Sequence, residues 1–345
     1  LKYDIHLTSG LTAAFNVVNS ELYGDHSSEN YAMYAQVDKN IGRFDLTAGV
    51  RGEYFRQNDL RPDSYTYFRG DSTNFGLPIR PIFRTGIHYQ ALEYTHLRAS
   101  YGQAFRYPSV AERFAATSVG ALNIFPNPDL RPEKGWSAEI GVKQGLKIGK
   151  WKGFFDASAF INEYDNMMEF TFGFYIPEGV TPTIETIANY FGFRAENAEA
   201  ARITGLDFSL NGYGEIGPFE IITIMGYTYM NPISLNMDSI YRFGDPNFGG
   251  GFSDTSSNML KYRFNHLAKG DIQIGYKKYL LGFSGRYNSF MRNIDAIFEN
   301  GVTILPGTPL AQTTEILPGL REYRERNNRG DIVFDARVGY KINDT

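Results

Sequence analysis

The fold of this chain is predicted from two short runs of sequence, Phe105-Arg106-Tyr107-Pro108-Ser109 and Asn127-Pro128-Asp129-Leu130-Arg131-Pro132-Glu133. Before the first run, residues 97–102 alternate between apolar and polar or small side chains, and residues 138–146 resume that alternation after the second run. Such alternation is the pattern of a half-buried strand. The two prolines of the second run bias the residues before them away from helix. The stretch therefore predicts one strand, a long stiff loop and a second strand that leaves the loop.

The same two-residue period recurs along the whole chain. Counting the two strands around the opening stretch, we expect about twelve strands; the other ten lie near residues 2–16, 31–37, 43–53, 83–90, 155–162, 206–211, 219–229, 271–277, 281–287 and 332–340. Alternation assigns the side chains of each strand to two faces. We expect an apolar face that includes Phe44, Leu46, Phe208, Leu210, Phe334 and Val338. The opposite, polar face should include Asp45, Arg51, Asp207, Ser209, Asp335 and Arg337.

The connections between these strands alternate between short and long. Short connections lie near residues 40–42, 92–95, 148–150, 214–217 and 277–279, and long ones near 58–80, 107–133, 174–197, 232–260 and 294–329. The first connection, residues 19–30, is of intermediate length and should lie with the long ones. A membrane barrel has short periplasmic turns and long extracellular loops. We therefore expect the turns around Asn40, Thr95, Gly149, Gly214 and Lys278 to share one end of a barrel.

The composition agrees with a membrane barrel and argues against other classes. The 345 residues include no Cys, carry a net charge of −4, and are 15% aromatic, with 24 Tyr and 27 Phe. No run approaches the ~18 apolar residues of a transmembrane helix. Aromatic girdles at both membrane interfaces explain the excess of Tyr and Phe. The lack of Cys excludes a disulfide framework, and the mild negative charge argues against binding to nucleic acid.

The opening stretch also resembles a known family signature. Phe-Arg-x-Pro, then Asn-Pro-Asp-Leu-x-Pro-Glu and x-x-Glu-x-Gly, is similar to the motif of TonB-dependent outer-membrane receptors, here in a Bacteroidetes-like form. These receptors are plugged β-barrels that import scarce nutrients. We expect the motif residues to shape the loop and the strand ends rather than bind ligand. They are Phe105, Arg106, Pro108, Asn127, Pro128, Asp129, Leu130, Pro132 and Glu133.

The resemblance implies an all-β fold, a transmembrane antiparallel β-barrel. Residues 1–345 would form one partial outer-membrane barrel domain, the later part of a 22-stranded barrel whose plug domain is absent from this chain. About twelve strands cannot close such a barrel. With neither a signal peptide nor an initiating Met, the chain is expected to be mature or partial, without the plug, the early strands and the last two strands.

The long loops are rich in aromatic and Arg side chains that suit an anionic ligand containing rings. The candidate ligand-binding residues are Arg61, Tyr65, Tyr67, Arg69, Tyr190, Phe193, Arg194, Tyr241, Arg242 and Phe243. An alternative is that these side chains meet lipopolysaccharide phosphates or only pack the loops. Residues 320–327 could form a short helix in the last long loop.

The resemblance implies active import of a ferric siderophore, or of a similar iron or vitamin ligand, across the outer membrane of a Gram-negative bacterium. The implied partners are outer-membrane lipid and lipopolysaccharide, the TonB energy-coupling complex through the plug, the nutrient itself, and a possible surface lipoprotein. Neither a cofactor nor enzymatic activity is implied. A passive porin or adhesin barrel, a glycan-importing receptor and an outer-membrane enzyme stay open as alternatives.

Further features bear on these alternatives. Family haem receptors carry a His between the motif halves, which residues 105–130 lack, and glycan importers often have Trp-Glu where this chain has Pro132-Glu133. Asp25-His26-Ser27 has nucleophile chemistry, but neighbours in a polar loop rarely point at one another. Asp245-Pro246-Asn247 with Asp254 could hold calcium, although the spacing is not that of an EF-hand. The five His residues show no metal-ligand spacing.

Overall fold

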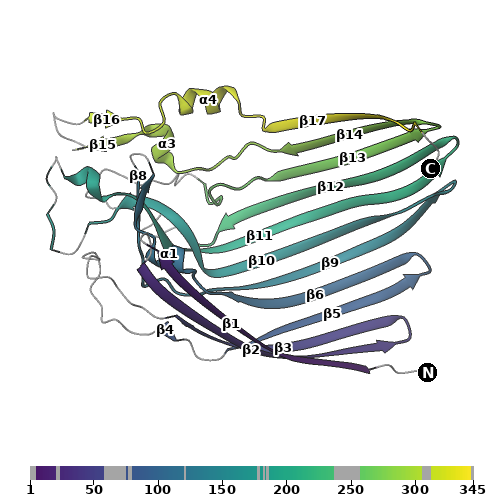
Figure 1. Ribbon diagram of the computed structural model, residues 1–345, viewed down its shortest axis with the longest axis horizontal. Helices are drawn as coiled ribbons and strands as arrows, with labels where there is room; N and C mark the ends of the chain where they lie inside the picture. The colour runs from purple at the N-terminus through teal and green to yellow at the C-terminus, as the bar shows by residue number, and fades with distance from the viewer. Residues whose placement is uncertain are drawn as a thin grey trace.

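The structure, a computed structural model, describes residues 5–20, 24–57, 75–76, 80–119, 122–176, 179–181, 183, 186–236, 257–304 and 312–342. Within these residues, successive strands form one curved antiparallel sheet (Figure 1). In spatial order its strands are β1 (Ile5–Ser20), β2 (Gly24–Ile41), β3 (Phe44–Gln57), β5 (Arg80–Leu92), β6 (Thr95–Arg106), β9 (Glu133–Ile148), β10 (Trp151–Phe174), β11 (Phe191–Ile216), β12 (Phe219–Ser234), β13 (His266–Tyr276), β14 (Tyr279–Asn288) and β17 (Asp331–Tyr340). The expected all-β antiparallel fold of about twelve strands is confirmed. Among the described residues, no pairing joins β1 to β17.

Smaller elements lie in the long connections. They are β4 (Phe75–Gly76), α1 (Val110–Phe114), β7 (Thr117–Val119), β8 (Leu122–Phe125), the 3₁₀ turn η1 (Ile187–Tyr190), α3 (Ala296–Asn300), β15 (Val302–Ile304), β16 (Gln312–Thr314) and α4 (Leu320–Arg326). Helix α4 lies where residues 320–327 were expected to be helical. Among the described helices, none is long and apolar enough to cross a membrane.

The short turns all lie at one end of the sheet, at the right in Figure 1. Each joins two neighbouring antiparallel strands, as in β2–β3, β5–β6, β9–β10, β11–β12 and β13–β14. Two of the turns are also bonded to a neighbouring strand, through Glu215 of β11 and Gly145 of β9. Lys150 N donates to Glu215 O at 3.1 Å, and Gly145 N donates to Tyr94 O at 2.7 Å. The predicted parity of the connections is therefore confirmed, and the long connections define an opposite end, called here the loop end.

The two faces of the sheet are those that alternation predicted. Ion pairs gather on the polar face, where Arg337 Nη2 lies 2.8 Å from Asp271 Oδ2. On the other face, Phe208 pairs laterally with Ala157 and Tyr227. The strand register places the twelve predicted side chains on their expected faces.

Aromatic pairs lie on the apolar face in two rows. Near the short turns, ring centroids lie 4.5 Å apart in Phe44–Tyr89, 5.3 Å in Phe219–Tyr276 and 5.2 Å in Tyr279–Tyr340. Farther along the strands are the pairs Phe15–Tyr31, Tyr101–Trp136 and Phe208–Tyr227. Two aromatic rows that flank an apolar band are the arrangement of a membrane barrel.

Several strands continue beyond the ends that alternation predicted. β10 has 24 residues and β11 has 26, whereas about 9–11 tilted residues cross a bilayer. The expected loop over 174–197 is therefore shorter, and Phe193 and Arg194 lie in β11. The expected loop over 19–30 was also wrong, because β1 and β2 pair through Ser20 and Gly24. Pairing by backbone hydrogen bonds continues where both faces meet water, and there the period-two pattern is lost.

Candidate functional site at the loop end

The motif belongs to a connection, residues 107–132, that crosses the loop end and is called here the strap. It begins with α1, whose capping box is formed by Ser109 and Glu112. Arg106 Nη1 donates to Glu112 at 2.7 Å and its Nη2 donates to Glu133 at 3.3 Å. Burial opposes ionisation of Glu112, but the bonds from Arg106 and Ser109 lower the pKa of its carboxyl below the ordinary value. The first half of the motif thus fixes the entry of the strap.

Arg113 is the centre of the strap, although it is not among the residues predicted from the sequence. Its side chain is buried, donates through Nε and Nη2 to the carbonyl oxygen of Pro128, and donates through Nη1 to Gln57 Oε1 at 2.7 Å. Asn127 N donates to the Arg113 carbonyl at 2.8 Å. The guanidinium therefore joins both halves of the strap to β3. No local signal marked this arginine, because its partners are 15 and 56 residues away.

Next to Arg113, the ring of Phe114 stacks on His26 of β2. The ring centroids are 3.8 Å apart and the planes are 6° from parallel. His26 is buried, at 1% exposure, within a strand. The expectation that Asp25-His26-Ser27 lies in a polar loop is thus corrected, and the His26 ring packs the strap against the sheet.

The second half of the motif fastens the strap to the long hairpin of β10 and β11. Asn127 Nδ2 donates to Ala195 O at 2.8 Å and to Glu196 Oε2 at 3.0 Å, while its Oδ1 accepts from Asp129 N at 3.2 Å. Leu130 is fully buried against Met168 and Ala195. An Asn side chain that bonds the backbone two residues ahead is a turn-former. These contacts shape the turn and fasten it to the hairpin, and that the motif residues do not bind ligand stays a prediction.

The strap also adds a strand to the sheet. β8 pairs in parallel with β11 over Gly192–Arg194, on the edge of β11 that extends beyond β12. A Cβ at Gly192 would overlap the backbone of Asn123, so glycine is required for this approach. α1 contacts β2 and β3, and β8 pairs with β11. The strap therefore links strands that β5, β6, β9 and β10 separate in the sheet (Figure 1).

An aromatic cluster covers the hairpin beyond the strap. Phe172 makes edge-to-face contacts with Phe191 and Phe193, at centroid distances of 4.3 and 4.7 Å, and Phe298 of α3 joins them. Such edge-to-face pairs add to the area that the rings bury. The cluster therefore joins β10 and β11 to the last long connection.

Arg194 lies on the other face of β11. Its guanidinium is ion-paired with buried Glu196 and lies 4.3 Å from the ring centroid of Tyr175. Burial raises the pKa of the Tyr175 hydroxyl well above its ordinary value. Arg194 is therefore engaged in packing the hairpin.

Three side chains join two long connections and are called here the clamp: Lys261 and Asp295, which are buried, and Tyr262, which is partly exposed. Asp295 is fully buried, and its carboxylate accepts from Lys261 Nζ at 2.6 Å and from the Tyr262 hydroxyl at 2.5 Å. Burial and the Asp295 charge raise the pKa of Tyr262 above its ordinary value. A buried carboxylate costs several kcal/mol unless it is paired and bonded, so this arrangement holds residues 257–265 against α3.

The structure places the predicted ligand residues in two groups. Arg61, Tyr65, Tyr67, Arg69, Tyr241, Arg242 and Phe243 lie outside the described residues, as do the calcium candidates Asp245-Pro246-Asn247 and Asp254. Tyr190 ends the 3₁₀ turn, and Phe193 and Arg194 pack in the hairpin. Among the described residues, no group of three or more His, Asp or Glu side chains could hold a metal ion.

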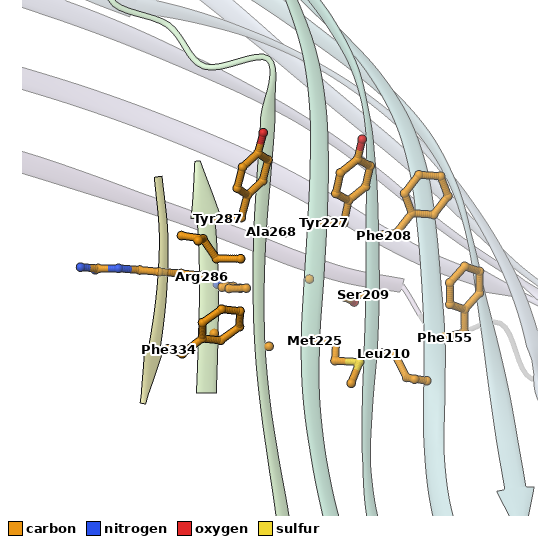
Figure 2. Close-up of a pocket in the computed structure, with 15 residues that line it drawn as sticks. Phe155, Phe208, Ser209, Leu210, Met225, Tyr227, Ala268, Arg286, Tyr287 and Phe334 are labelled. Carbon is orange, nitrogen blue, oxygen red and sulfur yellow. The ribbon is translucent and has the colours of Figure 1, made fainter. Parts of the chain in front are cut away.

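A shallow hollow of about 430 Å³ lies away from the loop end, over β10 to β17 (Figure 2). It lies among apolar side chains such as Phe208, Leu210, Met225, Tyr227 and Phe334. Small-molecule sites need a few convergent polar groups to orient the ligand. The hollow is thus a dip in the apolar face between aromatic side chains, not the ligand site.

An open antiparallel sheet with an apolar face between aromatic rows, a charged face, short turns at one end and strapped loops at the other defines a transmembrane β-barrel wall. Residues 2–345 match the family model described as TonB dependent receptor-like, beta-barrel, and the chain belongs to this family.

Two curated relatives agree with the family. Over 169 residues the chain is 26% identical to the vitamin B12 transporter BtuB of Vibrio vulnificus, and over 180 residues it is 25% identical to the hemoglobin-haptoglobin utilization protein B of Neisseria meningitidis. Each alignment covers 48% of this chain and 22% of the relative.

Solved structures show the same fold. The Serratia marcescens hemophore receptor HasR superposes with a TM-score of 0.62 at 16% identity, over 99% of this chain and 51% of the receptor. The copper transporter OprC gives 0.64 at 14% identity, over 99% of this chain and 47% of its own. The ferric-catecholate receptor Fiu of E. coli gives a TM-score of 0.53 at 16% identity, over 99% of this chain and 45% of the receptor. The chain thus spans about half the length of these structures.

Proposed function

We propose that this chain forms the greater part of the barrel wall of a transporter that imports a scarce nutrient across the outer membrane of a Gram-negative bacterium. The observation that carries the proposal is the match of the family model to residues 2–345. The charged face, with Arg98 between Glu139 and Asp156 and Arg337 on Asp271, fits a wall that borders a water-filled or plugged lumen. The apolar face would meet lipid and, at its outer rim, lipopolysaccharide.

Energy for import would come from the TonB complex, acting on a plug encoded elsewhere in the full-length polypeptide. The strap and the clamp support a division in which the plug moves and the barrel wall stays fixed. A wall that stays fixed while a plug moves needs loops joined to one another and to the sheet, and Arg113 and Asp295 supply such joints. A surface lipoprotein is a further partner that we propose for the loop end.

The ligand that we propose is an anionic, ring-containing chelate such as a ferric siderophore. Its candidate contacts stay Arg61, Tyr65, Tyr67, Arg69, Tyr190, Phe193, Arg194, Tyr241, Arg242 and Phe243. Exposed side chains on α4 supply the same chemistry, since Tyr323 is 57% exposed and Arg321 and Arg326 are exposed beside it. A guanidinium pairs with carboxylate or catecholate oxygens and an aromatic face stacks on rings.

Growth of a strain that lacks the gene tests the proposal. The strain would be grown on one limiting source at a time: ferric siderophores of several chemical classes, haem, vitamin B12, or single glycans. We expect failure on one ferric siderophore class, restored by the wild-type gene and abolished by a variant unable to couple to TonB. Failure to grow on a glycan or on haem alone would mean that this compound, and not a ferric siderophore, is the ligand. Unimpaired uptake without TonB would contradict active import.

A further inference from the structure

A second hollow, of about 380 Å³, lies on the polar face near the short turns, far from the strap and the clamp. Its lining comes from β5, β6, β9, β10 and one turn, and consists of His88, Tyr94, His96, Arg98, Lys143, Gly145 and Phe154. The register places each strand residue of this lining on the polar face. We call it the imidazole pocket.

Stacked and flattened side chains build the walls of the pocket. The rings of His88 and His96 stack with centroids 5.0 Å apart and planes within 18°. Arg98 lies flat across the neighbouring strand over Gly141, where a Cβ would come within 2.7 Å of the guanidinium. Because Gly141 has no side chain, the guanidinium can lie along the wall and leave the hollow open.

The polar side chains of the pocket can donate hydrogen bonds, and its acidic neighbours, which include Glu93 beside Tyr94, already have partners. Arg98 is neutralised by Glu139 and Asp156 at 2.8 Å each. The carboxylate of Asp45 lies 2.9 Å from His88 Nδ1. None of these acids belongs to the lining itself.

Two groups in the lining are available to bind a ligand. Lys143 Nζ lies 3.8 Å from the Phe154 ring centroid, and none of the described carboxylates lies within 4.0 Å of it. His96 Nδ1 is buried and has no hydrogen-bond partner among the described residues. A buried polar atom without a partner is costly, and an ammonium on a ring face is free to turn toward an anion.

We propose that the imidazole pocket binds an oxyanion, a carboxylate or a phosphate, with Lys143 as the charge partner and His96 as the hydrogen-bond partner. The oxyanion has two possible sources: a free anion in the lumen, or an acidic side chain from the part of the full-length polypeptide outside this chain. The chain spans about half of the matched structures, so such a part is expected. The proposal does not depend on which nutrient is imported.

The test uses purified full-length receptor in detergent. Thermal unfolding is compared in sodium phosphate and in sodium chloride of equal ionic strength, for wild type, Lys143→Gln, His96→Phe and the matched control Lys147→Gln. Lys147 is exposed on the same strand and outside the pocket, and Phe preserves the ring stack but not the nitrogen. For a free oxyanion we expect phosphate to raise Tm by about 2 °C in wild type and in the control, but not in the two pocket variants.

If an acidic side chain of the receptor fills the pocket, phosphate has no effect on any variant. Lys143→Gln then lowers Tm more than Lys147→Gln, and a crystal structure of the full-length receptor shows a carboxylate oxygen within hydrogen-bond distance of Lys143 Nζ. Equal Tm values for Lys143→Gln and Lys147→Gln in both salts, with only water or neutral groups at Lys143 in the crystal, would overturn the proposal.

Discussion

The sheet near its short turns and the loop end differ in what joins their parts. In the sheet, each strand pairs with its neighbour in sequence, and ion pairs such as Arg337–Asp271 lie on one exposed face. At the loop end, Arg113 bonds residues 15 and 56 positions away, and Asp295 bonds Lys261 34 positions away. Local pairing builds the sheet, whereas a few buried polar groups join the loops over long separations.

This difference predicts where substitutions act. A change in the sheet should weaken insertion and folding of the whole barrel, because every strand contributes to one continuous ladder. A change in the clamp should open the loop end locally and leave the barrel folded, and a change in the strap should act mainly on assembly. Proteins open in such separate cooperative units, whose opening free energies hydrogen exchange can measure.

The largest effect is expected from Asp295→Ala. The substitution leaves the Lys261 ammonium buried without its carboxylate, and removing one partner of a buried pair costs about 3–5 kcal/mol. Hydrogen exchange of residues 257–265 and 293–300 should accelerate accordingly, while exchange in β12, β13 and β14 stays slow. The double variant Lys261→Met/Asp295→Leu should recover much of the protection, because apolar groups of similar size can replace a buried pair. No acceleration in Asp295→Ala would contradict the clamp.

The next effect is expected from Leu210→Arg on the apolar face. An arginine facing lipid near the bilayer midplane costs about 2–4 kcal/mol, and the matched neighbour Ser209→Arg on the polar face should cost much less. Folding of the full-length receptor into lipid vesicles, followed by denaturant titration, measures both. Equal costs for the two arginines would reject the assignment of the faces.

The sheet could be predicted from the sequence because its signal is local. Lipid on one face and polar surroundings on the other impose a two-residue period, and Leu210 and Ser209 obey it. The pattern ends where the strands leave the bilayer, since both faces then meet water or loops. There the period predicts a loop at His26 and too short a β10–β11 hairpin, and it leaves Phe193 and Arg194 in the loop although they lie in β11.

The candidate site at the loop end could be predicted only in part, for the same reason. The motif residues could be recognised, but their partner Arg113 could not. Val110–Phe114 has the composition of an ordinary exposed helix, and nothing in it indicates that its arginine is buried. Asp295 was missed likewise, since one Asp in a long connection carries no local sign of a lysine 34 residues earlier. Contacts between distant segments, not periodicity, decide such positions.

A smaller and different effect is expected from the motif double variant Asn127→Ala/Asp129→Ala. It removes the Asn127 amide from the carbonyl of Ala195 and from the carboxylate of Glu196, which keeps its ion pair with Arg194, so the loss should be about 1–3 kcal/mol in all. The amount of receptor that reaches the cell surface should fall, with ligand affinity of the surviving molecules little changed.

Tyr241→Ala/Arg242→Ala is the matched contrast, and it should leave surface receptor intact and weaken uptake. Surface labelling and ligand titration separate the two quantities. A motif variant that assembles normally but no longer binds ligand would show that the strap itself is the ligand site.

The smallest effect is expected from Lys150→Gln, which removes an ion pair at the short-turn end. Lys150 Nζ lies 2.7 Å from Glu215 Oε2, almost the distance between Lys261 and Asp295, but the two side chains are 81% and 53% exposed instead of 9% and 0%. Water and salt screen the exposed charges, and neither partner becomes buried when the other is removed. We expect no measurable change in Tm at physiological salt, and at most a slight fall at low ionic strength. A large fall in Tm would mean that Lys150 and Glu215 are covered in the full-length receptor. The difference between an exposed ion pair at the short turns and a buried one at the loop end would then not hold.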